Sequence, residues 1–208
     1  MIRLSEPLTA DIRDFLNNNA LTEFSYRDLG CTRGRNVAGF NTDRLRIEVG
    51  TGEETLEKAK RSLRDWRQFS TAWVRLCWPY KKLAPGTVVA VVAHHYALVS
   101  VNAARIVYVI DEPTRFGFAF GTLTRHVVRG EMAFLVYLEE SGKVFYEVTS
   151  ISRPAHWLSW VFYPLGRQLQ TRFMRDSLHA LLASLLNQPP PRRSGTGDSP
   201  ASGAPLSG

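Results

Sequence analysis

The sequence predicts an α+β protein in which a curved antiparallel sheet wraps around a long C-terminal helix. Three observations support this fold class. Apolar runs with strand periodicity follow one another between residues 87 and 151 with only short turns between them, as in an antiparallel meander. One strand and one amphipathic helix precede these runs. A stripe of apolar residues at helical spacing follows them, and this late helix is the only element after the sheet able to cover one of its faces.

The composition is that of an ordinary globular protein, with 44% hydrophobic and 22% charged residues among 208. We expect residues 1–187 to form a single domain with an N-terminal helical extension. Residues 188–208 are rich in proline, glycine and serine and contain almost no large apolar side chain. Such a segment buries too little apolar surface to offset the conformational entropy that it would lose on folding, so we expect a disordered tail.

From the N-terminal residues we expect no secretory signal, and the apolar runs are too short for us to expect a membrane span. Cys31 and Cys77 have no CxxC spacing, which fits unpaired thiols in a reducing compartment. We therefore expect a soluble cytoplasmic protein. The net charge of +7 is compatible with attraction to anionic lipid, nucleic acid or an acidic partner, and charge alone does not choose among them.

The N-terminal part is expected to begin with a short amphipathic helix, because apolar residues from Leu8 to Leu16 recur at helical spacing. Residues 22–41 show no clear periodicity and are expected to be mostly irregular. Residues 44–49 alternate between apolar and charged side chains, which predicts a half-buried strand.

A helix is expected from about residue 52 to Trp66. The spacing of Thr51 and Glu54 predicts a capping box at its start. Most of the surface away from its apolar stripe is basic. We favour a solvated face over a lipid-headgroup or nucleic-acid surface, because basic helices are common and undiscriminating.

The expected strands that follow are residues 72–78, 87–94, 97–111, 115–123, 131–139 and 144–151. The long third run is expected to break near Asn102, where a bulge would let the sheet curl. The chain is expected to become helical from His156. Pro164 must kink that helix or open a new one, and the apolar stripe of the long C-terminal helix begins at Leu165.

The strand that starts at Arg115 has one bulky face and one nearly bare face. The bulky face carries Phe116, Phe118, Phe120 and Thr122, whereas the alternate positions carry only glycine and alanine. Small residues at these positions indicate that a helix, another segment or a ligand approaches closely. If the bulky face meets the C-terminal helix, the core is filled and a cavity there is disfavoured.

The order of elements is similar to the helix-grip architecture of the START and polyketide-cyclase superfamily. A set of motifs narrows this resemblance: YRDLGCT at 26–32, GTGE at 50–53, Trp66, Pro85-Gly86, RIVYVIDE at 105–112, FGFAFGTLTRH at 116–126, RGE at 129–131, SRP at 152–154 and QTRF at 170–173. As a set they resemble the uncharacterised bacterial and plant family called domain of unknown function nineteen-ninety, over about residues 24–182. The resemblance implies a helix-grip fold, which commonly leaves an apolar cavity between sheet and helix, and it implies no established activity.

His126 and Glu131 are the candidate catalytic residues. They flank a turn that could bring an imidazole and a carboxylate together as a general acid and base. A turn stabilised by side-chain hydrogen bonds is the plainer interpretation, and we favour it.

The candidate ligand-binding residues lie on the sheet and at its end: Arg105, Tyr108, Phe116, Phe118, Phe120, Thr122 and Arg153. Arg105 is expected on the strand face that also carries Val107 and Val109. A charged group in such a strand must be paired or solvated, so pairing with a cross-strand carboxylate such as Glu147 is favoured. The alternative is a cationic anchor for an acidic ligand head, and Arg153 has the same two interpretations.

Trp157 and Trp160 lie in an aromatic patch beside basic residues, which suits an anionic membrane surface. Packing over the end of the sheet is the plainer explanation. The five histidines show no metal-ligand spacing, and neither a phosphate-binding loop nor a nucleophile elbow is present. We therefore expect no metal site and no cofactor.

Three functional hypotheses remain. The first is a protein that binds an apolar or amphipathic, lipid-like small molecule between the sheet and the C-terminal helix. The second is a cyclase or hydrolase that uses His126 and Glu131, with Tyr108 or Asp111, as acid–base groups. The third, binding of nucleic acid through the basic helix, is the weakest because no recognition motif accompanies the charge.

Overall fold

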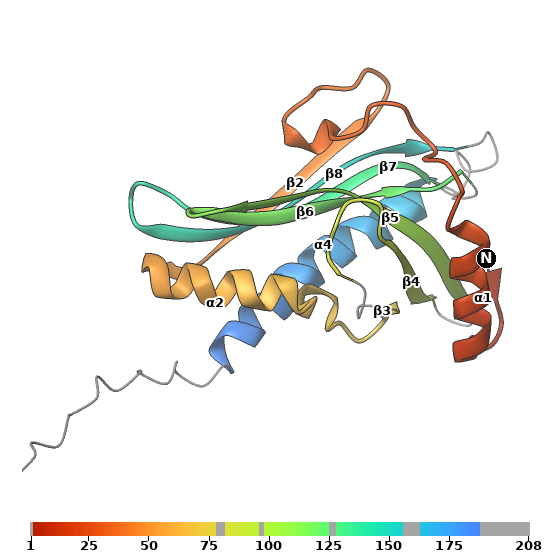
Figure 1. Ribbon diagram of the computed structural model, residues 1–208, viewed down its shortest axis with the longest axis horizontal. Coiled ribbons are helices and arrows are strands. Elements are labelled where there is room, and N and C mark those ends of the chain that lie inside the picture. The colour runs from red at the N-terminus through yellow and green to blue at the C-terminus, as the bar shows by residue number, and fades with distance from the viewer. Residues whose placement is uncertain (1, 78–81, 96–97, 125–127, 156–162, 188–208) are drawn as a thin grey trace, which may run out of the picture.

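The computed structural model describes residues 2–77, 82–95, 98–124, 128–155 and 163–187. Within these ranges an antiparallel sheet of eight strands has the order β2-β8-β7-β6-β5-β4-β3, with β1 paired to β5. The strands are β1 (Ile2–Arg3), β2 (Asn41–Thr51), β3 (Val74–Cys77), β4 (Val88–His95), β5 (Leu98–Glu112), β6 (Arg115–Thr122), β7 (Val128–Leu138) and β8 (Lys143–Pro154). The helices are α1 (Thr9–Asn19), α2 (Gly52–Arg64) and α4 (Tyr163–Leu186), with the 3-10 helices η1 (Cys31–Arg33) and η2 (Arg67–Phe69). The predicted fold class, a curved antiparallel sheet with a long C-terminal helix, is confirmed (Figure 1).

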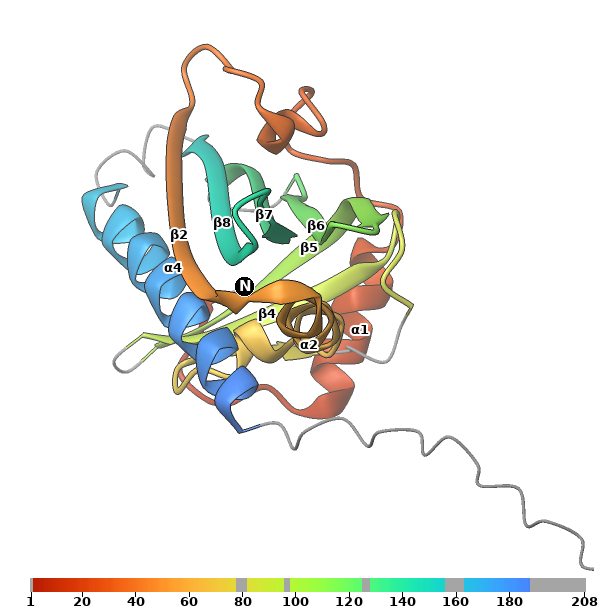
Figure 2. The same ribbon diagram turned by 90° about the vertical axis from the view of Figure 1, so that its left-hand side faces the viewer.

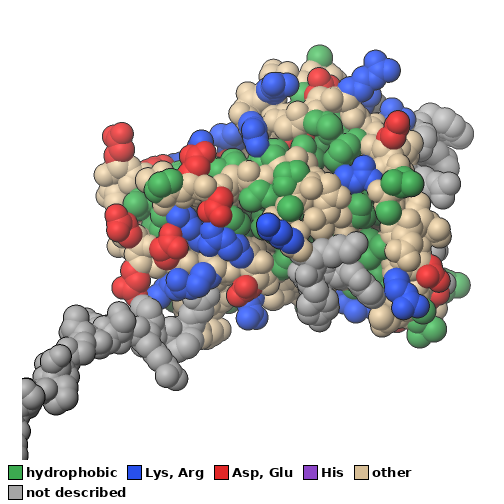
Figure 3. All heavy atoms as spheres, viewed as in Figure 1, with side chains coloured by type: hydrophobic (Ala, Val, Ile, Leu, Met, Phe, Trp, Pro, Cys, Tyr) green, Lys and Arg blue, Asp and Glu red, His purple; other side chains and the backbone are tan. Residues whose placement is uncertain are grey.

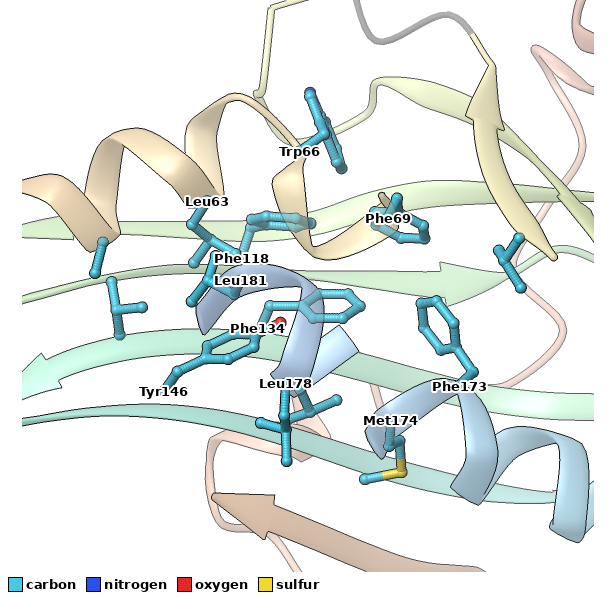
Figure 4. Close-up of a cluster of buried hydrophobic side chains, with 14 of the residues drawn as sticks. Leu63, Trp66, Phe69, Phe118, Phe134, Tyr146, Phe173, Met174, Leu178 and Leu181 are labelled. Carbon is cyan, nitrogen blue, oxygen red and sulfur yellow. The ribbon is translucent and has the colours of Figure 1, made fainter. Parts of the chain in front are cut away.

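One face of the sheet, which we call the inner face, is covered by α2, η2 and α4 (Figure 1). The phenylalanines of β6 point to this face. Phe118 is fully buried, and its ring centroid lies 5.3 Å from that of Phe134 and 4.8 Å from that of Trp66. Figure 4 shows these rings together with Phe173 and Tyr146 between the sheet and the helices. The bulky face of β6 therefore meets the long helix, and aromatic side chains fill this interface in the described part of the chain.

The opposite face, which we call the outer face, is covered in two places. Helix α1 packs over β4 and β5 through Ile12 and Leu16. Residues 24–40, which are irregular apart from η1, cross the outer face beside β7 and β8, away from both α2 and α4 (Figure 2). A Cβ added to Gly121 of β6 would meet the Tyr26 hydroxyl. The bare side of β6 thus makes room for this irregular segment.

The break expected near Asn102 is wrong, because β5 continues through this residue. The register shift lies between Ile106 and Tyr108. A bulge adds one residue to a strand and exchanges the faces of the residues beyond it. Consequently Val109 packs in the inner core, whereas Arg105 pairs with Gly121 on the outer face, and the expectation that Arg105 and Val109 share a face is also wrong.

The predicted capping box at the start of α2 is not formed. Thr51 is the N-cap residue, but its side chain makes no capping hydrogen bond. Thr51 is also the last residue of β2 and pairs with Lys143, and the next amide, that of Gly52, donates to the Gly142 carbonyl at 2.8 Å. The hairpin between β7 and β8 therefore accepts from the first amide of α2, whereas the Thr51 side chain was expected to accept from the third.

Neighbouring carboxylates compensate for most of the positive charge on the surface of α2. Lys58 pairs with Glu54 at 2.8 Å, and Arg64 pairs with Asp111 of β5 at 2.8 Å. Figure 3 shows acidic and basic side chains interspersed over this side of the molecule. This arrangement fits a solvated helix face. Among the described residues, no helix is long and apolar enough to cross a membrane.

Candidate ligand-binding site

The irregular segment on the outer face is fixed by the carboxylate of Glu131, which is 2% exposed. Its Oε2 accepts hydrogen bonds from the Tyr26 hydroxyl at 2.7 Å and from the Gly30 amide at 2.8 Å. Its Oε1 accepts from the amide of Thr32 at 3.2 Å and from the hydroxyl of the same residue. Gly30 adopts a φ of 77°, a left-handed conformation that glycine tolerates best. Glu131 therefore anchors η1 to the sheet.

Tyr108 of β5 extends this network toward the surface. Its hydroxyl lies 2.8 Å from that of Thr32. Because the single hydroxyl proton of Thr32 goes to Glu131, Tyr108 is the donor in this hydrogen bond. The guanidinium of Arg33 lies over the Tyr108 ring, 4.0 Å from its centroid. Burial raises the pKa of the Tyr108 hydroxyl, so it stays protonated at neutral pH.

Burial also raises the pKa values of Tyr26 and Cys31, which lie beside Glu131. Burial, and then the charge of Glu131, raise the pKa of the Tyr26 hydroxyl far above its ordinary value. The same two causes raise the pKa of the Cys31 thiol to about 12. Both groups are therefore neutral at physiological pH, and the hydroxyl of Tyr26 acts as a hydrogen-bond donor.

A half-open hollow of about 550 Å³ lies on the outer face beside this network. Its floor is the sheet, where Ala133, Leu135 and Ile110 offer apolar surface, and its end wall is η1. The lining residues that carry polar side chains are Thr32, Arg33, Arg44, Tyr108, Asp111, Glu112, Arg115, Glu147 and Thr149. A second hollow of about 330 Å³ adjoins it, shares Thr32, Gly34, Arg44 and Thr149, and adds Arg35 and Asn36. The two hollows therefore meet at Thr32 of η1 and at Gly34.

The carboxylates around the larger hollow already have arginine partners. Glu147 lies 3.3 Å from Nε of Arg44 and also accepts from the Thr149 hydroxyl at 3.1 Å. Glu112 accepts two hydrogen bonds from Arg115, at 2.7 and 3.0 Å. The remaining lining carboxylate, that of Asp111, pairs with Arg64.

The predicted site residues do not gather in one place. Phe116 and Phe118 are buried in the inner core, and Phe120 packs against it, so these three rings serve as packing groups between the sheet and the helices. Thr122 exchanges hydrogen bonds with Gly130 across the end of the β6–β7 pair.

The two arginines predicted to bind a ligand, Arg105 and Arg153, also lie in different places. Arg105 donates to the carbonyls of Asn19 and Ala20 at the end of α1, at 3.3 and 3.0 Å. The expected pairing of Arg105 with Glu147 is wrong, because Glu147 pairs with Arg44. Arg153 lies over the ring of Phe40, 4.7 Å from its centroid.

The predicted pair of His126 and Glu131 is not tested as a pair. His126, Trp157 and Trp160 lie outside the described residues. Glu131 lines neither hollow, and donors from residues 26–32 occupy both of its oxygens. Glu131 thus holds residues 26–32 to the sheet, and the turn that we expected side-chain hydrogen bonds to stabilise lies partly outside the described residues.

Tyr108 is the predicted ligand-binding residue whose polar side chain lines the larger hollow. Its hydroxyl contacts Thr32 in the wall. Sequence reasoning missed Arg33, Arg44 and Thr149. The available signal was the motif at 26–32, whose glycine and threonine now prove to be partners of Glu131. Because residues 26–32 show no periodicity, the sequence did not indicate which strands this segment would cover.

Comparison with known proteins agrees with this architecture. Residues 25–180 match the model of the family described as Domain of unknown function (DUF1990). The chain belongs to this family. The DUF1990 protein is 33% identical over 195 residues to a UPF0548 protein of Deinococcus radiodurans, covering 88% of this chain and 98% of the relative. It is 28% identical over 207 residues to a UPF0548 protein of Dictyostelium discoideum, covering 89% and 96%.

Solved structures show the same fold at low sequence identity. The DUF1990 protein resembles a protein of Thermus thermophilus with a TM-score of 0.53 and 15% identity, covering 70% of this chain and 97% of the other. It resembles the Zhui aromatase/cyclase of Streptomyces with a TM-score of 0.52 and 11% identity, covering 71% and 94%. The fold is therefore the helix-grip fold, which the aromatase/cyclase shares.

Proposed function

We propose that the DUF1990 protein binds a small amphipathic molecule in the larger hollow on the outer face of its sheet. The observation that carries this proposal is the hollow itself: about 550 Å³, with an apolar floor at Ala133 and a polar wall at η1. This volume lies in the range of small-molecule sites, which combine apolar surface with a few placed polar groups. The wall is held rigidly, since Glu131 fixes Gly30 and Thr32.

The outer face is favoured over the space between sheet and α4, where the sequence led us to expect the ligand. In the described residues that space holds the rings of Phe118, Phe134 and Phe173, with Tyr146 fully buried beside them. A ligand there would have to displace close-packed aromatic side chains, each of which contributes substantially to stability. The outer hollow can be filled without such a change.

A second candidate function is acid–base catalysis of the cyclase or hydrolase kind. The observation in its favour is the hydrogen-bond chain from Glu131 through Thr32 to Tyr108, whose side chain lines the hollow. Because each donor in this chain points toward Glu131, the Tyr108 oxygen could accept a proton from a bound ligand while its own proton moves to Thr32 and that of Thr32 moves to Glu131. Conversion of the bound molecule by the protein, lost in Tyr108→Phe with binding retained, would support catalysis over simple binding.

Ligand extraction tests the binding proposal. Native mass spectrometry of the protein purified from its own organism should reveal a bound small molecule. The variant Ala133→Leu, which fills the floor of the hollow, should lose it. Leu178→Ala, which opens space in the inner core instead, should keep it. A ligand retained by Ala133→Leu and altered by Leu178→Ala would contradict the proposal and favour the sheet–helix interface.

A further inference from the structure

We infer that the polar end of the bound molecule is an anionic group, a phosphate or a carboxylate, and that Arg33, Arg35 and Arg44 recognise it. The inference rests on the proposed function, because it concerns the same hollow and the one adjoining it. Arg33 lines the larger hollow, Arg35 lines the smaller one, and Arg44 lines both. The three residues thus surround the shared wall at Thr32 and Gly34.

Ion pairing among the residues that line the two hollows leaves two arginines without a carboxylate partner. Each carboxylate that lines the larger hollow has one arginine partner, as described above: Asp111 with Arg64, Glu112 with Arg115 and Glu147 with Arg44. Arg33 and Arg35 remain, and no carboxylate of the described residues forms an ion pair with either. A concave surface with unpaired cations concentrates anions, because its low-dielectric walls focus the field.

The way in which Arg33 is held suits an anion better than a neutral group. Its guanidinium carbon lies over the Tyr108 ring, 4.0 Å from the ring centroid. A stacked guanidinium still directs N–H donors outward from its edge, in the fork geometry that matches a carboxylate or a phosphate. Tyr108 is itself fixed through Thr32, so the ring keeps the guanidinium in place before a ligand arrives.

Arg44 is the third arginine of the site, and Glu147 holds its side chain in position. The Arg44 side chain is 56% exposed and touches Glu147 through Nε, whereas Glu147 is 13% exposed and also holds Thr149. A single contact through Nε leaves the two terminal nitrogens of the guanidinium free to bind an incoming anion. Glu147 therefore orients Arg44 across the floor of the hollow rather than neutralising it fully.

The test uses three probes: octyl phosphate below its micelle concentration, octanol, and inorganic phosphate. Amide chemical shifts in NMR titrations give both the dissociation constant and the place of binding. Octyl phosphate should bind about tenfold more tightly than octanol, because charge-assisted hydrogen bonds add to apolar contact. The shifts should centre on Thr32, Gly34, Ala133 and Thr149.

The double variant Arg33→Ala/Arg35→Ala should weaken octyl phosphate binding about tenfold and leave octanol binding unchanged. The matched control is Arg61→Ala, an exposed arginine of α2 on the other side of the sheet, which should change neither. Raising the salt concentration should weaken octyl phosphate binding to the wild-type protein and have little effect on the double variant.

The outcomes separate the inference from the proposed function. If octyl phosphate and octanol bind equally tightly at the hollow, the inference of an anionic group is wrong and the proposed function still stands. Inorganic phosphate that binds as tightly as octyl phosphate would support the arginine site and overturn an amphipathic ligand. Shifts confined to the inner core, or no binding of any probe, would overturn both.

Discussion

At the scale of single residues, Glu131 shows how one buried carboxylate organises a region of irregular chain. Burying a charge is unfavourable unless hydrogen bonds replace the lost water. Here four donors do so, and all of them belong to residues 26–32, which lie about a hundred positions earlier in the chain. The segment that walls the candidate site therefore depends on a residue that does not itself touch the hollow.

Replacement of Glu131 by glutamine should lower the free energy of unfolding by about 3 kcal/mol, because the new amide group would face donors instead of accepting from them. Urea denaturation measures this change. The control is Glu139→Gln, which removes a surface pair with Arg46 at 3.3 Å and should change the free energy by less than about 1 kcal/mol. Similar losses in both variants would contradict the anchoring role of Glu131.

At the scale of elements, the docking of α2 on the sheet combines apolar packing with a buried polar contact made by Lys60. Lys60 is buried on α2, and its ammonium donates to the carbonyls of Glu112 and Pro113 in the β5–β6 turn, at 3.1 and 2.7 Å. It also pairs with Glu57 at 2.8 Å. This contact ties the inner helix to the turn next to the open end of the larger hollow, where Glu112 is a lining residue.

The variant Lys60→Met should keep the apolar stem and lose the donors, which leaves two turn carbonyls without their partner. We expect a loss of about 1–3 kcal/mol and faster amide hydrogen exchange in the β5–β6 turn. Lys58→Met is the matched control on the same helix, since Lys58 forms only an i,i+4 pair with Glu54. It should cost less than about 0.5 kcal/mol. Unchanged exchange in Lys60→Met would show that the turn does not depend on α2.

At the scale of the whole molecule, the sheet divides two different environments. The inner face meets α2, η2 and α4 through aromatic rings, whereas the outer face combines a buried polar network with a half-open hollow. Several ionisable groups are buried in the two environments. Burial raises the pKa of the Tyr146 hydroxyl on the inner face and those of Tyr26 and Cys31 on the outer face.

These pKa shifts predict a loss of stability in alkaline solution. The pKa of Cys31 rises from its ordinary value of 9.0 to about 12 on folding, so between these values the folded state holds a proton that the unfolded state has released. The tyrosines add to the same effect above about pH 10. Because the folded state binds more protons, the free energy of unfolding should fall as the pH rises from about 9 to 12, and it should be insensitive to these groups below that window.

Urea unfolding at a series of pH values under reducing conditions checks this expectation. Cys31→Ala should show a smaller decrease in stability between pH 9 and 10 than the wild-type protein. A wild-type stability that stays constant or increases over this range would contradict the burial of protonated groups.

Hydrophobic periodicity in the sequence determined the order of elements, the antiparallel sheet and the long C-terminal helix, because period and local spacing need no knowledge of distant residues. It also identified two distinct faces on β6. It could not decide which face meets α4, since both faces of a strand have the same period, and the bulge at Val107 exchanged the faces of β5 in a way that no local pattern recorded.

Only the tertiary structure decided the site. Tyr108 was predicted from its strand, but the wall at Thr32 and Arg33 comes from a segment without periodicity. Arg44 is one of the charged residues of the half-buried strand predicted at 44–49. Contacts between residues 26–32 and Glu131 join parts of the chain that local sequence treats as independent. The aromatic face fills the core, and the bare face, with the irregular segment across it, carries the hollow in which we propose that a ligand binds.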